Sequence, residues 1–224
     1  MKFQYLRSCS LLLLLTYLKV CCFAQNSKTK TASWILPSVT YQASPSVKFS
    51  AQFGINHYQR LKIFYLQTFI KSGKWIILNP SYLYINRSIL NGIHIKEHTL
   101  MNSVIFNLSL NKILVDDRNV LWNRFRVEGQ DFHFYRNRLR VTLPFSFKGK
   151  DAKIYVFDEA SYFFNRARWS RNRIAVGVGY DVTKWLNTDI SFVHEADVYN
   201  GKLNLFFITG TIQFFHKQQG SSVK

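Results

Sequence analysis

The sequence predicts an all-β protein: an antiparallel up-and-down transmembrane β-barrel of about ten strands, with twelve as the alternative. Three observations predict it. Apolar and polar side chains alternate over long segments, short turns join consecutive segments, and no helical period of 3.6 residues appears after the N-terminal segment. Most segments hold about 12 to 15 residues, against 5 to 6 in ordinary sheets. At a tilt near 40°, that length crosses an apolar band of about 25 Å.

The first 24 residues have the features of a cleaved secretory signal peptide. Lys2 and Arg7 precede an apolar run at residues 11–15, and residues 22–24 resemble a cleavage site before Gln25. All three cysteines lie in this segment, so the mature chain is expected to contain no disulfide and no cysteine-based metal site. Its removal leaves 27 basic and 12 acidic side chains, a net charge of +15. Export argues against nucleic acid as the partner of this basic chain.

Residues 25–33 are expected to form a flexible leader, residues 34–216 the barrel domain and residues 217–224 a polar C-terminal tail. A first strand at residues 34–42 is weakened by Pro37, because proline removes a backbone donor from the ladder. Single-chain bacterial barrels usually have an even number of strands. We therefore expect this segment to be a plug or an edge.

Ten further strands are expected, and most are joined by turns of a few residues, as at residues 72–73, 111–112 and 183–184. The longest connection is the polar stretch at residues 87–96. Such short connections favour antiparallel neighbours. The expected strands are residues 47–55, 60–71, 74–86, 100–110, 113–127, 135–147, 152–164, 168–182, 186–197 and 202–215.

The strand at residues 135–147 shows the clearest alternation. Successive strand side chains point to opposite faces, so one face is mainly apolar with aromatic residues at its ends, and the other carries three arginines. An arginine facing lipid near the midplane costs about 2 to 4 kcal/mol. We therefore expect the arginines to face an enclosed, wet lumen. The outer face comprises Tyr135, Asn137, Leu139, Val141, Leu143, Phe145 and Phe147, and the inner face Arg136, Arg138, Arg140, Thr142, Pro144 and Ser146.

Other strands extend the arginine-rich face. The pattern N-R-apolar-x-V begins at Asn123, Asn137 and Asn172. Asp158 and Glu159 point to opposite faces, and Glu159 is assigned to the lumen because it shares a face with Lys153. Two interpretations remain open: the charges pair and stabilise a narrow lumen, or they form an anion-preferring pore or acidic-ligand site. The predicted lumen cluster is Arg124, Arg126, Arg136, Arg138, Arg140, Glu159, Arg171, Arg173, Asp189 and Glu195.

No motif for catalysis is present. The six histidines form no H-E-x-x-H motif, and the one H-x-x-x-H pair, His94 and His98, falls where no helix is expected to bring both rings to one side. No nucleophile elbow or phosphate-cradling loop occurs. His98 beside Glu97 is expected to have an interfacial or hydrogen-bonding role. The sequence predicts no enzyme, no cofactor and no metal site.

Several short motifs resemble, in order and spacing, a family of bacterial outer-membrane barrels known as domain of unknown function 2490. The likeness covers about residues 34–215. It implies an outer-membrane β-barrel and supplies no activity or catalytic residues. The motifs are Glu97 with His98 at a strand start, residues 135–140, Asp158 with Glu159, and Asn172 with Arg173 followed by residues 177–180.

The expected location is the outer membrane of a Gram-negative envelope. The favoured function is a structural barrel or a narrow, porin-like, anion-preferring pore. Two alternatives are kept: a barrel enzyme acting on lipid or lipopolysaccharide through Glu97, His98 or the arginines, and a soluble periplasmic ligand-binding barrel. The expected partners are outer-membrane lipid and lipopolysaccharide, with a small anionic solute as a candidate ligand, and a monomer is expected.

Overall fold

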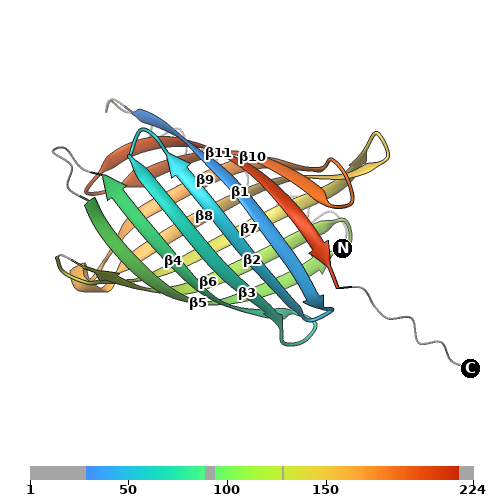
Figure 1. Cartoon of the computed structure of the whole chain (residues 1–224), viewed down its shortest axis with the longest axis horizontal. Helices are drawn as coiled ribbons and strands as arrows, with labels where there is room; N and C mark the ends of the chain where they lie inside the picture. Colours follow the sequence, from blue (N-terminus) through green and yellow to red (C-terminus); the bar gives the residue numbers. More distant parts are fainter. Residues whose placement is uncertain (1–28, 89–93, 128, 217–224) are drawn as a thin grey trace, which may run out of the picture.

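A computed structural model describes residues 29–88, 94–127 and 129–216, and these form a closed β-barrel of eleven strands (Figure 1). A short 3-10 helix, η2 (Phe164–Arg166), links β8 to β9. The predicted signal peptide, residues 25–28 of the leader, residues 89–93, residue 128 and the tail at 217–224 lie outside the described residues. Residues 30–33, expected to belong to the flexible leader, are instead part of β1. The strands are β1 (Lys30–Ser44), β2 (Val47–Asn56), β3 (Leu61–Lys71), β4 (Ile76–Ser88), β5 (His94–Leu110), β6 (Ile113–Arg126), β7 (Phe132–Phe147), β8 (Lys150–Phe163), β9 (Arg168–Asp181), β10 (Leu186–Asp197) and β11 (Gly201–Phe215).

The predicted fold class is confirmed, and the strand count of eleven falls between the two expected numbers. The segment at residues 34–42, expected to be a plug or an edge, is instead part of β1 and a member of the barrel wall. Within the described residues, consecutive strands pair antiparallel, whereas β1 and β11 close the barrel in parallel. An odd count requires this parallel seam, because β1 and β11 then run in the same direction.

The two rims of the barrel are distinguished by the ends of the chain. We call the rim where β1 begins the N-rim and the rim where β11 ends the C-rim. Turns at the C-rim are short: Lys148 and Gly149, between β7 and β8, both have positive φ, at 52° and 73°. This backbone geometry suits a two-residue hairpin because its twist matches that of the flanking strands.

Two prolines interrupt the ladders locally without ending their strands. Between Ile35 and Ser38, around Pro37, the β1–β2 pairing is interrupted, and the register is the same on both sides. The β3–β4 pairing is interrupted in the same way around Pro80, where the side-chain amide of Asn79 donates to the Thr68 carbonyl at 2.9 Å. Proline has no backbone N–H to donate, which explains why strand pairs are missing around each proline. The closed barrel tolerates both gaps because each strand is also held by its other neighbour.

Side chains of β7 alternate between the interior and the outer surface. Leu139, Val141 and Leu143 are 49%, 38% and 44% exposed, whereas Thr142 is 7% exposed. The Arg138 and Arg140 side chains reach carboxylates inside the barrel. The apolar residues therefore form the outer face, and the arginines point to the interior.

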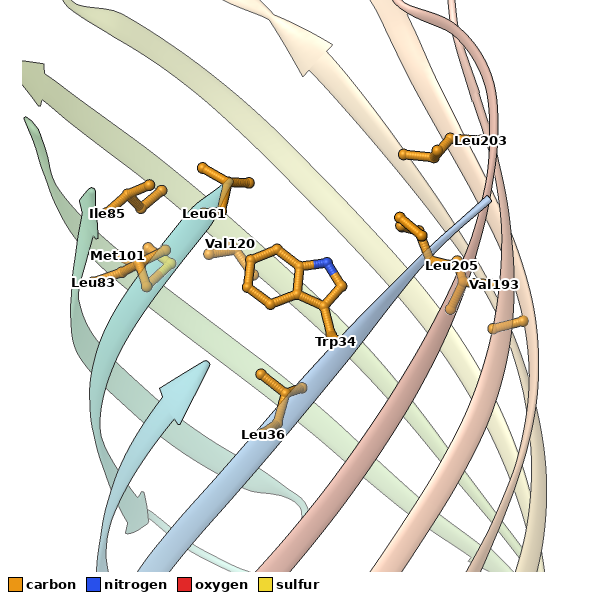
Figure 2. Packing of buried hydrophobic residues seen from close by; sticks show 12 residues of the cluster. Trp34, Leu36, Leu61, Leu83, Ile85, Met101, Val120, Val193, Leu203 and Leu205 are labelled. Carbon is orange, nitrogen blue, oxygen red and sulfur yellow. The ribbon is translucent and has the colours of Figure 1, made fainter. Parts of the chain in front are cut away.

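The interior contains an apolar cluster as well as charges. It is contributed by β1, β3 to β6 and β9 to β11, so it crosses the lumen, and Figure 2 shows its side chains pointing inward from these strands. Trp34 of β1 stacks on Phe207 of β11 with ring centroids 6.4 Å apart. Met101 from the other side of the barrel is almost fully buried. Where this cluster crosses the lumen, the interior is filled with apolar side chains, as in the core of a soluble protein.

Small residues make room for large ones on the inner face. A side chain at Gly177 of β9 would collide with the ring of Tyr155 on β8, and one at Gly179 would collide with Lys153. The Tyr155 ring therefore lies over Gly177, and its hydroxyl donates to Asp189 at 2.6 Å. These glycines pack the lumen wall rather than forming a nucleotide-binding loop.

Candidate functional site: the charged side of the lumen

The ion-paired residues of the interior lie on β5 to β10, and we call this the charged side of the lumen. Glu159 of β8 lies at the centre of the charged side. It is 3.4 Å from Arg136 of β7 and 3.2 Å from Arg173 of β9. Arg173 also contacts Glu195 of β10 at 2.6 Å. Four neighbouring strands are therefore linked by consecutive ion pairs at this level.

The chain of pairs extends toward the N-rim through β9 and β10. Arg171 lies 2.8 Å from Asp197 and 3.8 Å from Glu195. The Asp197 carboxylate also accepts hydrogen bonds from the backbone amides of Tyr199 and Asn200. Asp197 thus fixes the turn into β11 as well as Arg171.

Two further carboxylates each hold a pair of arginines. Asp116 of β6 contacts Arg138 at 3.4 Å and Arg140 at 2.6 Å. Glu97 of β5 contacts Arg124 at 2.6 Å and Arg126 at 2.9 Å. Both carboxylates are almost completely buried. Sharing one acid between two arginines leaves the lumen with an excess of positive charge.

Arg118 of β6 differs from the other lumen arginines. Among the described residues it contacts no carboxylate. Its Nη2 donates to neutral acceptors, the Tyr65 hydroxyl at 3.2 Å, Asn79 Oδ1 at 2.9 Å and the Ser103 hydroxyl at 3.3 Å. The acceptors come from β3, β4 and β5, so the Arg118 side chain links β6 to the three strands that follow it along the barrel wall.

Aromatic faces accommodate part of the surplus charge. The guanidinium group of Arg136 lies 4.4 Å from the ring centre of Trp122, and that of Arg138 lies 5.5 Å from Phe157. Cation–π contacts of this kind stabilise a partly desolvated guanidinium group by about 0.5 to 2 kcal/mol. The arginines are therefore built into the interior packing.

The described network contains more cations than carboxylates. Lys153 also belongs to it, with its amine 3.9 Å from an Asp189 carboxylate oxygen. The cations are Arg118, Arg124, Arg126, Arg136, Arg138, Arg140, Lys153, Arg171 and Arg173, and the carboxylates are Glu97, Asp116, Glu159, Asp189, Glu195 and Asp197. Chemically, the arrangement can stabilise the barrel or attract anions; within the described residues no three metal-ligating side chains gather.

All ten residues of the predicted lumen cluster lie on the inner face, and each takes part in at least one ion pair. The predicted cluster did not include Glu97, Asp116, Arg118, Lys153 and Asp197. Asp116 and Asp117 are adjacent, so alternation alone assigns only one of them to the lumen. The ion pairs with Arg138 and Arg140 identify Asp116 as the inner one.

Glu97 and His98 lie on opposite faces of β5. Glu97 is buried beneath Arg124 and Arg126, whereas His98 is exposed on the outer face, where its Nδ1 lies 2.6 Å from the Tyr82 hydroxyl. The two side chains cannot act on one substrate atom from these positions. This separation argues against a barrel enzyme in which Glu97 and His98 act together.

One cluster at the N-rim lies outside the strands. The guanidinium group of Arg166 lies 3.6 Å from the ring centre of Tyr199, and that of Arg168 lies 5.6 Å away. A hydrogen bond from Arg166 lowers the pKa of the Tyr199 hydroxyl, because the nearby cation favours the phenolate. The contact between Arg166 and Tyr199 holds the β8–β9 connection against the β10–β11 turn.

Within the described residues, no helix is both long enough and apolar enough to cross a membrane. No curated protein matches the sequence. The family model described as "Protein of unknown function (DUF2490)" matches residues 24–201, which is most of the chain. The protein therefore belongs to the DUF2490 family.

Proposed function

We propose that this protein is an integral outer-membrane barrel with a closed lumen, whose role in the envelope is structural. The observation that carries the proposal is the outer face, which exposes large hydrophobic residues on every side of the barrel. Large exposed hydrophobic residues include Ile35 of β1, Leu100 of β5, Val156 of β8 and Ile190 of β10. Apolar patches beyond a few hundred Å² are rare on soluble monomers. An acyl-chain environment explains such a continuous apolar surface.

The packing of the interior favours a closed lumen over an ion-conducting pore. Trp34 and Leu36 from β1, together with Met101 from β5, pack in a cluster that crosses the lumen. On the charged side, the arginines are paired with carboxylates or lie over aromatic rings. An ion passing through the barrel would have to separate these packed and paired groups. The surplus positive charge is the observation that favours an anion-preferring pore, which remains the second candidate.

The membrane proposal is tested by expressing the full chain with its N-terminal segment in a Gram-negative host. We expect the protein in the outer-membrane fraction, requiring detergent for extraction. The unheated sample is expected to migrate differently from the boiled one on a denaturing gel, because closed barrels resist unfolding by detergent. Recovery as a detergent-free, monodisperse periplasmic protein would end the proposal in favour of the soluble barrel.

The closed lumen makes a separate prediction in planar lipid bilayers. We expect the refolded protein to insert without producing conductance steps, because the apolar cluster and the ion pairs fill its interior. Insertion is verified by protease protection of the same preparation. Regular steps with a preference for anions would contradict the closed form and support the pore.

A further inference from the structure

Several arginines lie close together on the inner faces of β6 and β7. Arg118 lies directly opposite Arg138 in the β6–β7 ladder, and the charge of Arg118 acts on both Arg136 and Arg138. Like charges directly opposite each other on neighbouring strands destabilise a sheet. We call this set the arginine group: Arg118, Arg136, Arg138 and Arg140.

Two carboxylates lie beside the arginine group, and among the described residues neither forms an ion pair with Arg118. Asp116 contacts two members of the group, at 2.6 Å and 3.4 Å. Glu159 contacts a third member at 3.4 Å and is shared with Arg173 of β9. Four guanidinium charges thus face two carboxylate charges, one of them shared, so a surplus of at least two positive charges remains.

Solvent reaches this part of the interior, and the structure indicates from which rim. The Arg140 and Lys153 side chains point into the barrel but remain 33% and 40% exposed. The apolar cluster lies mainly toward the N-rim: Trp34 is early in β1 and Leu205 is early in β11, and both strands begin at that rim (Figure 2). An ion would therefore approach from the C-rim, and the apolar cluster would stop it from crossing the barrel.

Positive charge also lines this approach. Lys48, near the C-rim on β2, forms no ion pair among the described residues, and the charge of Lys153 repels it. Two acids, Asp151 and Asp181, share the inner face by alternation at the C-rim ends of β8 and β9, and Asp181 accepts from the Asn187 amide at 2.6 Å. In the described part of the chain neither acid pairs with the arginine group, so the surplus there persists.

An oxyanion of the phosphate class suits this set of groups. Guanidinium groups bind phosphate through paired N–H donors. The hydroxyls of Tyr65 and Ser103, which accept hydrogen bonds from Arg118, each have a proton of their own to donate. A doubly charged ion also matches the surplus charge, whereas chloride supplies only one negative charge.

We infer that the arginine group binds one phosphate-class oxyanion, which enters from the C-rim and lies beside Arg118 and Arg138. The inference goes beyond the proposed structural role and uses only the interior of the barrel, so it does not depend on the membrane location. The apolar cluster stays packed on the N-rim side, so the bound ion is held rather than conducted.

The test is isothermal titration calorimetry of the purified barrel with inorganic phosphate. The protein is kept in an uncharged detergent without phospholipid, and sodium chloride holds the ionic strength constant. We expect saturable binding of one phosphate per chain. A parent protein that shows no saturable binding would overturn the site, whatever the variants do.

Arg118→Gln is expected to weaken phosphate binding about tenfold, the usual effect of losing one charge-assisted hydrogen bond. Because Arg118 has no carboxylate partner among the described residues, its removal leaves no acid unpaired and the barrel should fold, which gel mobility of the unheated sample verifies. Lys74→Gln is the matched control. It removes one positive charge from the exposed β3–β4 turn at the same rim, outside the lumen, and its affinity should equal that of the parent.

Two results with the variants would overturn the site. Equal weakening by Arg118→Gln and Lys74→Gln would show that phosphate responds only to the overall charge, and an unchanged affinity of Arg118→Gln would place the ion elsewhere. Short-chain phosphatidic acid tests the source of the phosphate. We expect it to bind more weakly than the free ion, because its acyl chains would have to enter a polar interior; tighter binding of the lipid would overturn the assignment to a free ion.

Discussion

Replacing Glu159 by glutamine is expected to lower the free energy of unfolding by about 3 to 5 kcal/mol, the usual cost of removing one partner from a buried ion pair. Glu159 is almost fully buried and is the shared partner of Arg136 and Arg173. The amide keeps the size of the side chain but leaves both guanidinium groups without this negative charge. The measurement is the urea-induced unfolding of the refolded barrel in lipid vesicles, followed by tryptophan fluorescence.

Asp158→Asn is the matched control. It removes a carboxylate from the neighbouring residue, but this one lies on the outer face and contacts Asn172 rather than an arginine. We expect its unfolding midpoint to stay close to that of the parent chain. If both variants unfolded at similar urea concentrations, the ion pairs around Glu159 would contribute little, and the lumen network would not be structural.

Ile208→Arg is expected to lower the free energy of unfolding from the bilayer by about 2 to 4 kcal/mol, because it places a guanidinium group near the membrane midplane. Ile208 is 48% exposed on the outer face, lies in the middle of β11 and pairs with the apolar residues Ile190 and Ile35. The same vesicle-based unfolding experiment measures the change.

Phe214→Arg provides the control for this substitution. Phe214 is exposed on the outer face near the C-rim end of the same strand. An arginine there reaches the interface, so the expected cost is about 0 to 1 kcal/mol. If Ile208→Arg were as mild as Phe214→Arg, the outer face would not be buried in hydrocarbon, because water accepts an arginine at either position.

Alternation along the strands was sufficient to predict the fold class. The side chains of residues 135–147 divide between interior and exterior as a period of two requires. Where two acids are adjacent, alternation shows that only one points inward. For Asp158 and Glu159, the face shared with Lys153 assigned Glu159 to the lumen, where it meets Arg136 and Arg173. For Asp116 and Asp117, the choice depends on Arg138 and Arg140 of the neighbouring strand β7.

Pairing between distant segments could not be predicted. Glu97 meets Arg124 and Arg126 only because β5 and β6 share a particular register. The parallel seam follows from β11 meeting β1, a contact between the two ends of the barrel that no local pattern encodes. Pro37 favoured an edge or a plug, but its missing donor interrupts only a short part of the β1–β2 ladder.

The polar residues on the outer face of β6 to β8, among them Asp117, Asn137 and Asp158, show a different limit. Asn137 belongs by alternation to the face assigned to lipid, and Asp117 shares that orientation on β6. Neither residue stands out in the sequence, because each is one polar residue in an otherwise apolar series. The register of β6, β7 and β8 brings the polar residues together at one depth.

The orientation of β7 is tested most directly by nitroxide labels on two neighbouring residues, Thr142→Cys and Leu143→Cys, in the refolded barrel in lipid vesicles. The measurement is power-saturation electron paramagnetic resonance with oxygen, which concentrates in hydrocarbon, and a water-soluble nickel complex. The label at Leu143 should be relaxed strongly by oxygen and weakly by nickel, and the label at Thr142 weakly by oxygen. A Leu143 label relaxed mainly by nickel would show that this face meets water, and the membrane barrel would be contradicted.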